Sequence, residues 1–295
     1  MIEVKNTFKD HVKKSFFLLP AIILLIAFFI IPIVMTVYYS FTNLALSGAA
    51  AQNTQFVGLE NYAKLFKDKN VLIAIKNTLI FLVGSLIGQQ IIGFVVALAM
   101  KKTAKGFRRV MGPIILAGWI LPEIVVALCA STFFGTEGTM NKLLGSIGLP
   151  SVKWLYAVPM LTVILANIWH GAAFSMMNYQ SALDGISDDI LEAAEIDGAG
   201  YFKSLIHIVI PCIKDTIATN TMLNTLSTLG VFGLIYTLTG GGPGTKTLTL
   251  PILMYKQAFV SQQLGYGTAI SMILLTIGLI LSVVYTKLMK SSEGV

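Results

Sequence analysis

Charged residues are scarce in this chain, and their scarcity decides its class. They make up 12% of the sequence, against 55% apolar residues, whereas a typical soluble domain has about 25% charged residues. Together with a mean hydropathy of +0.78, this composition excludes a water-soluble globular domain. Cysteine is nearly absent too. Cys129 and Cys212 lie in or near separate apolar segments, so the sequence indicates no disulfide framework.

Long stretches of the chain contain few or no charged residues. Residues 16–39, 77–100, 155–183, 216–245 and 257–286 contain none, and residues 110–134 contain only Glu123. Each stretch supplies the ~20 residues with which a helix crosses the hydrocarbon core, and unpaired backbone groups are costly in lipid. The sequence therefore predicts an all-α integral membrane protein forming a single domain over residues 1–295. Its helices are expected at about 16–39, 77–100, 110–134, 155–179, 213–238 and 266–287.

Lys and Arg predict the orientation of these spans. They gather in the N-terminal tail, in the loop after the second span and in the C-terminal tail (Lys5, Lys9, Lys13, Lys14; Lys101, Lys102, Lys105, Arg108, Arg109; Lys287, Lys290). Because cytoplasmic segments carry an excess of Lys and Arg, both termini are expected in the cytoplasm of a multi-pass plasma-membrane protein. The net charge of +7 then reflects topology and does not indicate nucleic-acid binding.

Acidic residues are concentrated in one place. Six of the 14 Asp and Glu residues fall between Asp184 and Asp197, in the loop 184–211 that the topology places in the cytoplasm. Asp188 and Asp189 are typical of a helix N-terminus, where carboxylates favour the macrodipole. Ala193, Ala194 and Gly198 predict a small-residue face that a partner could approach closely. The alternative is a solvated acidic loop.

The loop also carries a motif. Glu192-Ala193-Ala194, followed by Gly198, Ile208 and Pro211, resembles the EAA loop of ATP-driven (ABC) importer permeases, although Ile210 stands where that family usually has Leu. Phe56-Val-Gly-Leu-Glu-Asn-Tyr62 and Leu238-Thr-Gly-Gly-Gly-Pro243 resemble the carbohydrate branch of the family, of the maltose and glycerol-3-phosphate type.

The resemblance implies a type I importer permease with a cytoplasmic coupling helix, in the bacterial plasma (inner) membrane. Its partners would be a second permease, forming a heterodimer, two cytoplasmic ABC ATPase subunits and an extracellular or periplasmic solute-binding protein. The residues implied to contact the ATPase are those of the loop: Glu192, Ala193, Ala194, Asp197, Gly198, Ala199, Ile208 and Pro211.

ATP and Mg would be bound by the ATPase subunits, and the sequence predicts neither an enzyme nor a cofactor or metal site in this chain. Gly240-Gly-Gly-Pro-Gly-Thr-Lys-Thr247 lacks the ending of a phosphate-binding loop and follows a membrane helix, so its glycines are expected to form a turn. The three histidines, His11, His170 and His207, lie in separate segments without metal-ligand spacing.

Polar residues recur with helical spacing in the fourth and fifth spans. They are costly in lipid and usually face the bundle interior or a water-filled path, but Ser, Thr, Asn and Gly also hold membrane helices together; both interpretations stay open. Gly84 and Gly88 favour packing. The resemblance implies that substrate is held by Asn167, His170, Gly171 and Phe174, and by Asn224, Ser227, Thr228 and Val231. His170 and Ser227 replace an aliphatic and an aromatic residue of the maltose type.

Glu123 is the anomaly of the third span. A carboxylate there needs a partner or a raised pKa, and it stands where the family commonly has an aromatic residue. Two hypotheses are a bond to a substrate hydroxyl or amine and a bond to a polar group of the second permease. Gly233 likewise stands where many relatives have Asp.

The predicted function is therefore the permease subunit of a binding-protein-dependent importer for a sugar or oligosaccharide. An alternative substrate is glycerol-3-phosphate or another polyol-derived solute, although the cores of spans four and five contain no Lys or Arg to bind a dianion. The alternative from another class is a stand-alone secondary transporter or channel.

Overall fold

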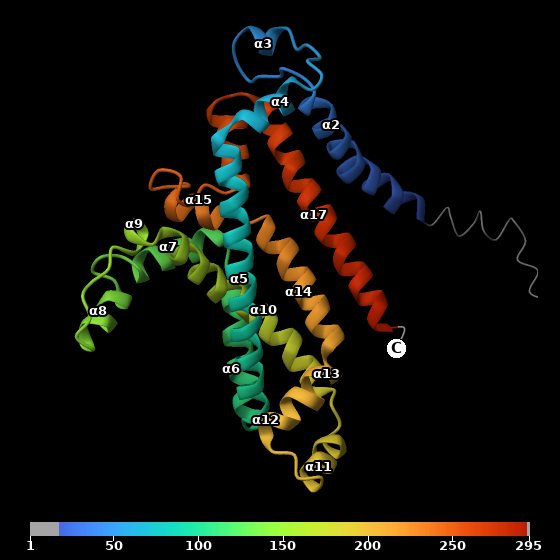
Figure 1. Cartoon of the computed structure of the whole chain (residues 1–295), viewed down its shortest axis with the longest axis vertical. Helices are drawn as coiled ribbons and strands as arrows, with labels where there is room; N and C mark the ends of the chain where they lie inside the picture. Colours follow the sequence, from blue (N-terminus) through green and yellow to red (C-terminus); the bar gives the residue numbers. More distant parts are fainter. Residues whose placement is uncertain (1–17, 294–295) are drawn as a thin grey trace, which may run out of the picture. The chain divides into compact units, whose positions relative to one another are not determined.

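The computed structural model describes residues 18–293, and Figure 1 shows their course. Within that range the chain folds into helices joined by turns, with one isolated β-bridge between Thr42 and Phe56. The lysines of the N-terminal tail, His11 and the first two residues of the predicted first span lie outside the described residues.

Four helices between residues 18 and 293 are long and apolar enough to cross a bilayer. They are Leu18–Ser40, α5 (Lys69–Lys101), α10 (Pro159–Asp184) and the Leu264–Lys287 part of α17 (Leu264–Glu293). Two bent pairs also qualify: α6 (Lys105–Ile120) with α7 (Glu123–Phe133), and α14 (Lys214–Leu229) with α15 (Gly233–Thr239). Counting each pair as one span gives the six spans that the sequence predicts.

The third and fifth spans are broken, where the sequence predicts continuous helices. The axes of α6 and α7 differ by 100°, and those of α14 and α15 by 48°. Leu121 and Pro122 between α6 and α7 have extended backbone, with ψ of 136° and 143°. A residue before proline is disfavoured in the helical region, so Pro122 explains why α6 ends where it does.

Shorter helices complete the described chain. The helix Leu18–Ser40 contains the π-helical turn η1 (Ile26–Ile30) and ends as α2 (Ile31–Ser40). The others are α3 (Ala49–Gln52), α4 (Glu60–Lys67), α8 (Thr139–Ser146), α9 (Trp154–Ala157), α11 (Asp188–Ile196), α12 (Tyr201–Ser204), η2 (Leu205–Val209), α13 (Ile210–Cys212), α16 (Leu250–Tyr255) and η3 (Lys256–Val260).

The chain divides into two compact units by its internal contacts, and the single domain that the sequence predicts stays a prediction. The first comprises residues up to Lys67 together with Met254–Met272. Its turn after α2 is held by Asn61, which donates hydrogen bonds to the carbonyls of Ser40 (2.9 Å) and Thr42 (2.8 Å). Tyr62 Oη lies 2.7 Å from Ser40 Oγ. Asn61 and Tyr62 of the motif at 56–62 therefore stabilise this turn in the first unit.

The second unit comprises Asp68–Leu253 and Ile273–Val295, and its most extensive helix contact joins α5 to α10. A Cβ placed on Gly84 would lie 3.0 Å from Ile164 Cδ1, and one on Gly88 only 2.2 Å from Ile168 Cδ1. Both glycines face α10, which confirms the predicted packing role of this pair. Small residues let membrane helices approach closely.

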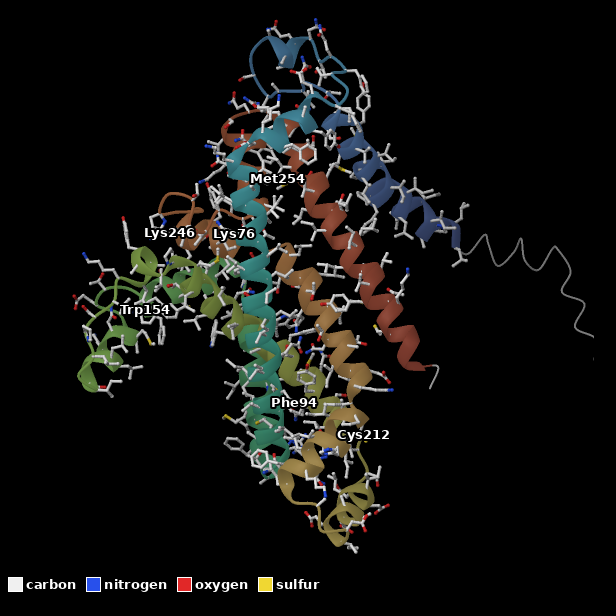
Figure 2. All side chains as sticks on the ribbon, viewed as in Figure 1. Lys76, Phe94, Trp154, Cys212, Lys246 and Met254 are labelled. Carbon is white, nitrogen blue, oxygen red and sulfur yellow. The ribbon has the colours of Figure 1, made fainter. Side chains whose placement is uncertain are left out.

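The turn after α15 lies in the same unit. Gly240, Gly241 and Gly244 have φ of 59°, 90° and 62°, conformations in which glycine avoids the steric cost of a side chain. This confirms the turn that the sequence predicts. Figure 2 shows Lys246 in this loop and Lys76 of α5 toward one end of the unit, whereas Phe94 and Cys212 lie toward the end formed by α11 to α13.

Candidate functional site: a surface helix and a polar helix interface

The acidic loop contains a short surface helix with defined ends. Its helix α11 begins at Asp188, and the Ser187 side chain accepts a hydrogen bond from the Asp189 amide (3.3 Å). Gly198 has a φ of +75°. It donates to the Glu195 carbonyl (3.0 Å), and the Ala199 amide donates to Ala194 (2.9 Å). These bonds form a Schellman C-cap, for which glycine is the preferred residue.

Gly198 thus terminates the helix, and its predicted contact with a partner stays a prediction. Its φ ends the helix, and nothing lies within 4 Å of the position where its Cβ would be. Ala194, the second alanine of the motif, is buried with 6% of its surface exposed, and its predicted place on the docking face stays a prediction. Glu192 and Ala193 are exposed, as that face requires.

Two apolar side chains of the loop are exposed, which the sequence did not predict. Ile196, the last residue of α11, is 87% exposed, and Phe202 in α12 is 74% exposed. Both side chains are therefore accessible to a partner protein. Ile196 lies within an acidic run of the sequence, but that pattern alone does not indicate that its side chain is exposed.

The loop is anchored on the helices beside it. Val209 and Ile213 join a buried cluster with Ala97 of α5 and with Tyr179 and Leu183 of α10. This packing joins the C-terminal part of the loop 184–211 to α5 and α10.

Basic residues at the end of α5 complete that anchor. Lys101 Nζ donates to the Leu183 carbonyl (2.7 Å), and Lys102 Nζ lies 3.8 Å from the centre of the Tyr201 ring. Arg108 of α6 forms a salt bridge with Asp184. Some of the acidic and basic side chains of this region therefore pair with one another within the chain.

A polar interface runs between α5, α10 and α14. Asn220 Nδ2 donates to Gln90 Oε1 (2.9 Å), and Tyr179 Oη donates to the same oxygen. Asn224 Nδ2 donates to Ser175 Oγ (2.7 Å). Each bond joins different helices, as expected for polar groups that hold membrane helices together.

The eight predicted substrate-path residues differ in their exposure and contacts. Four are buried in the chain (Asn167, Asn224, Thr228 and Val231). Gly171 lies against α5, because a Cβ there would be 2.3 Å from Gln89 Nε2. Of the eight, only Ser227 is exposed. That these residues bind substrate stays a prediction, and for the buried ones the geometry favours the packing interpretation.

His170 and Phe174 contact the broken third span. His170 Nε2 lies 3.1 Å from the Trp119 carbonyl and 3.2 Å from that of Leu121, and the Phe174 ring stacks on Trp119 with centroids 5.1 Å apart. Carbonyl oxygens only accept, so Nε2 carries the proton. These carbonyls lie at the C-terminal end of α6, where backbone acceptors lack helical partners.

Glu123 has a partner that neither hypothesis named. Its Oε2 accepts a hydrogen bond from the backbone amide of Leu234 (3.1 Å), in the first turn of α15. The carboxylate is therefore bonded within its own chain.

An open polar groove lies between α10 and α14, beside this interface. Its volume is about 390 Å³. Asn178 in its wall is oriented by a bond from its Nδ2 to Asn220 Oδ1 (3.0 Å). The groove is lined by Asn178, Ser181 and Ala182 of α10 and by Asp215, Thr216, Thr219, Asn220 and Leu223 of α14. Amides and hydroxyls in a membrane-spanning segment indicate a hydrated path or a binding surface.

Comparison with known proteins identifies the family. Residues 89–291 match the family described as the binding-protein-dependent transport system inner membrane component. The probable ABC transporter permease protein YurN of Bacillus subtilis is 31% identical, covering 94% of this chain and 96% of that protein. The multiple sugar-binding transport system permease protein MsmF of Streptococcus mutans is 31% identical, covering 94% and 95%. The trehalose/maltose transport system permease protein MalF of Thermococcus litoralis is 30% identical, covering 92% and 91%.

A solved structure shows the same fold. A chain of a bacterial ABC transporter involved in the import of the acidic polysaccharide alginate superposes with a TM-score of 0.80 at 24% identity, with 96% of each chain covered. The chain is therefore a member of the family of binding-protein-dependent transport system inner membrane components.

Proposed function

We propose that this chain is the permease subunit of an ATP-driven importer for a sugar or oligosaccharide, working with a second permease. The observation that carries the substrate class is the groove between α10 and α14. Its polar lining consists of amide and hydroxyl groups and one carboxylate, without Lys or Arg. Such groups donate to and accept from sugar hydroxyls. Relatives whose names state a sugar substrate, MsmF and MalF, support the same class.

Energy would enter at the acidic loop. We propose that two cytoplasmic ATPase subunits, which bind ATP and Mg, dock on the exposed side chains of Glu192, Ala193 and Ile196. The anchoring of the loop on α5 and α10 through Val209 and Ile213 supports this role. A solute-binding protein would deliver substrate at the opposite end. A structure of the alginate transporter in complex with an alginate pentasaccharide-bound periplasmic protein supports such a partner.

The groove lining also favours one of the two candidate substrate classes over the other. The groove lining contains no Lys or Arg that could pair with a phosphate dianion. A neutral sugar needs no such partner. A polyol phosphate is therefore the weaker candidate.

The substrate class is tested with the cognate binding protein. The protein is screened by thermal shift against neutral di- and oligosaccharides and against glycerol-3-phosphate, and ATP hydrolysis by the reconstituted complex is then measured with each. We expect a neutral saccharide to stabilise the binding protein and to stimulate hydrolysis. Stimulation by glycerol-3-phosphate alone would contradict the proposed substrate.

A further inference from the structure

Glu123 stands at a junction of two broken spans. It is the first residue of α7, directly after the 100° break that follows α6. Its carboxylate reaches the amide of Leu234 at the start of α15, directly after the 48° break that follows α14. One hydrogen bond therefore joins the two half-helices that lie beyond the breaks.

Gly233 makes this contact sterically possible. A Cβ on Gly233 would lie 2.8 Å from Glu123 Oε2 and 3.3 Å from Glu123 Cβ, closer than non-bonded atoms approach without displacement. The backbone of Gly233 is not in the left-handed region, so the requirement for glycine is one of space. Glu123 and Gly233 are a sterically matched pair.

The same geometry explains how a carboxylate is tolerated in a predicted span. Glu123 lies in the first turn of its own helix α7 and bonds to the first turn of α15. The first amides of a helix lack intrahelical partners, and the positive end of the macrodipole favours a negative charge. The charge is therefore placed beside the N-terminal turns of two helices.

The other side of the break is held separately. His170 of α10 binds the Trp119 and Leu121 carbonyls, which fixes the end of α6. Glu123 fixes the beginning of α7 on α15. The break thus has two independent attachments, and α7 and α15 also share an extensive contact.

We propose that Glu123 is a positioning residue that makes α7 and α15 move as one body when the transport path opens and closes. This inference rests on the proposed function for its role in transport. It assigns Glu123 no contact with substrate. The bond adds a polar restraint to the packing of α7 on α15, so losing it loosens the coupling of the two half-helices.

The test exchanges the two matched residues in the full chain, assembled with its partner subunits. Glu123→Gly removes the carboxylate. Glu123→Gly combined with Gly233→Asp places a carboxylate at the start of α15 in the space that is vacated. Both variants share the glycine at 123, so their difference reports the carboxylate and not the added flexibility. Glu123→Gln keeps an oxygen acceptor without the charge, and Glu137→Gln, an exposed carboxylate beyond α7, is the matched control.

The movement is read with spin labels on α7 and α15. Cys129 is exposed on α7 and serves as one labelling site in a Cys212→Ser background; Thr237→Cys on the exposed surface of α15 supplies the other. We expect Glu123→Gly to broaden the distance distribution and to raise the uncoupled population by about tenfold, the factor given by losing one hydrogen bond to a charged group. The exchange variant should narrow it again, Glu123→Gln should be intermediate, and Glu137→Gln should match the parent.

An unchanged distribution in Glu123→Gly would overturn the proposal, as would a broadened one that the exchange variant leaves broad. If Glu123→Gly does not assemble, Glu123→Gln decides in the same way: a distribution identical to the parent's refutes the proposal. The distances are measured without substrate. A parent complex that transports no sugar but shows the expected distances would therefore contradict the proposed function alone.

Discussion

Asn224 of α14 donates a hydrogen bond to Ser175 of α10, with 2.7 Å between Nδ2 and Oγ. Both side chains are buried, so the amide is used to join two helices. The polar stripe of the fifth span therefore includes side chains that hold helices together. Asn220 and Asn224 of the stripe are buried and bond to neighbouring helices. The exposed Ser227 lies outside the groove, which Thr216 and Thr219 line together with Asn220.

Asn224→Ala should therefore lower stability more than it alters substrate affinity. Interhelical hydrogen bonds in membrane proteins contribute about 0.6 kcal/mol on average, and the lost packing adds to this cost. A thermal-unfolding assay in detergent should show a lower midpoint, while the KM of uptake in the assembled importer stays near the parent value. A raised KM with unchanged stability would show that Asn224 binds substrate instead.

The groove makes a complementary prediction. Thr219 is exposed in its wall, whereas the hydroxyl of Thr221, two residues on, already donates to the Ile217 carbonyl (2.6 Å). Thr219→Val should raise the KM of sugar uptake by about two- to tenfold, the effect of losing one neutral hydrogen bond. The matched Thr221→Val should leave KM unaltered. Equal effects of the two substitutions would remove the groove from the path.

Gly93 should tolerate no side chain. A Cβ there would lie 2.4 Å from Ser175 Cβ and 2.9 Å from the Met176 amide nitrogen, so Gly93→Ala forces α5 and α10 apart at a cost of about 1–3 kcal/mol. Gly112 of α6 has nothing within 4 Å of its Cβ position, and Gly112→Ala should be neutral or stabilising by up to about 1 kcal/mol. Thermal unfolding of the two variants compares them directly.

The exposed end of α11 should bind the ATPase through Ile196. Ile196→Asp places a charge where an apolar side chain would be covered, and we expect the ATPase subunits to co-purify less and substrate-stimulated hydrolysis to fall. Phe66→Asp is the control, since Phe66 is 84% exposed but lies outside the loop. Retention of the ATPase by Ile196→Asp would exclude this residue from the interface.

How far the sequence predicted this structure depended on the kind of signal. Uncharged stretches located the six spans because a bilayer imposes length and apolarity on every helix that crosses it. Gly84 and Gly88 predicted a close helix contact because their spacing places them on one helix face. The resemblance at Glu192–Pro211 located the acidic loop and led to the family that the comparisons show.

The sequence did not predict which polar side chains point where. Asn224 and Asn178 have similar surroundings in the sequence, yet one is buried against Ser175 and the other lines the groove. Their orientation is set by the way α10 and α14 pack. The bond from Leu234 to Glu123 joins residues 111 positions apart, across two breaks whose angles no local pattern indicates. Pro122 lies at the first break, yet the uncharged stretch 110–134 predicted a continuous helix there.

The central claim is that energy reaches this chain from another polypeptide. It is tested most directly in proteoliposomes that contain the chain with its partner permease, with or without the two ATPase subunits and ATP. In all of them, uptake of the sugar that the binding protein binds is measured. The account predicts uptake only when ATPase, ATP and loaded binding protein are all present. Uptake by this chain alone, driven by an ion gradient without the ATPase, would contradict it.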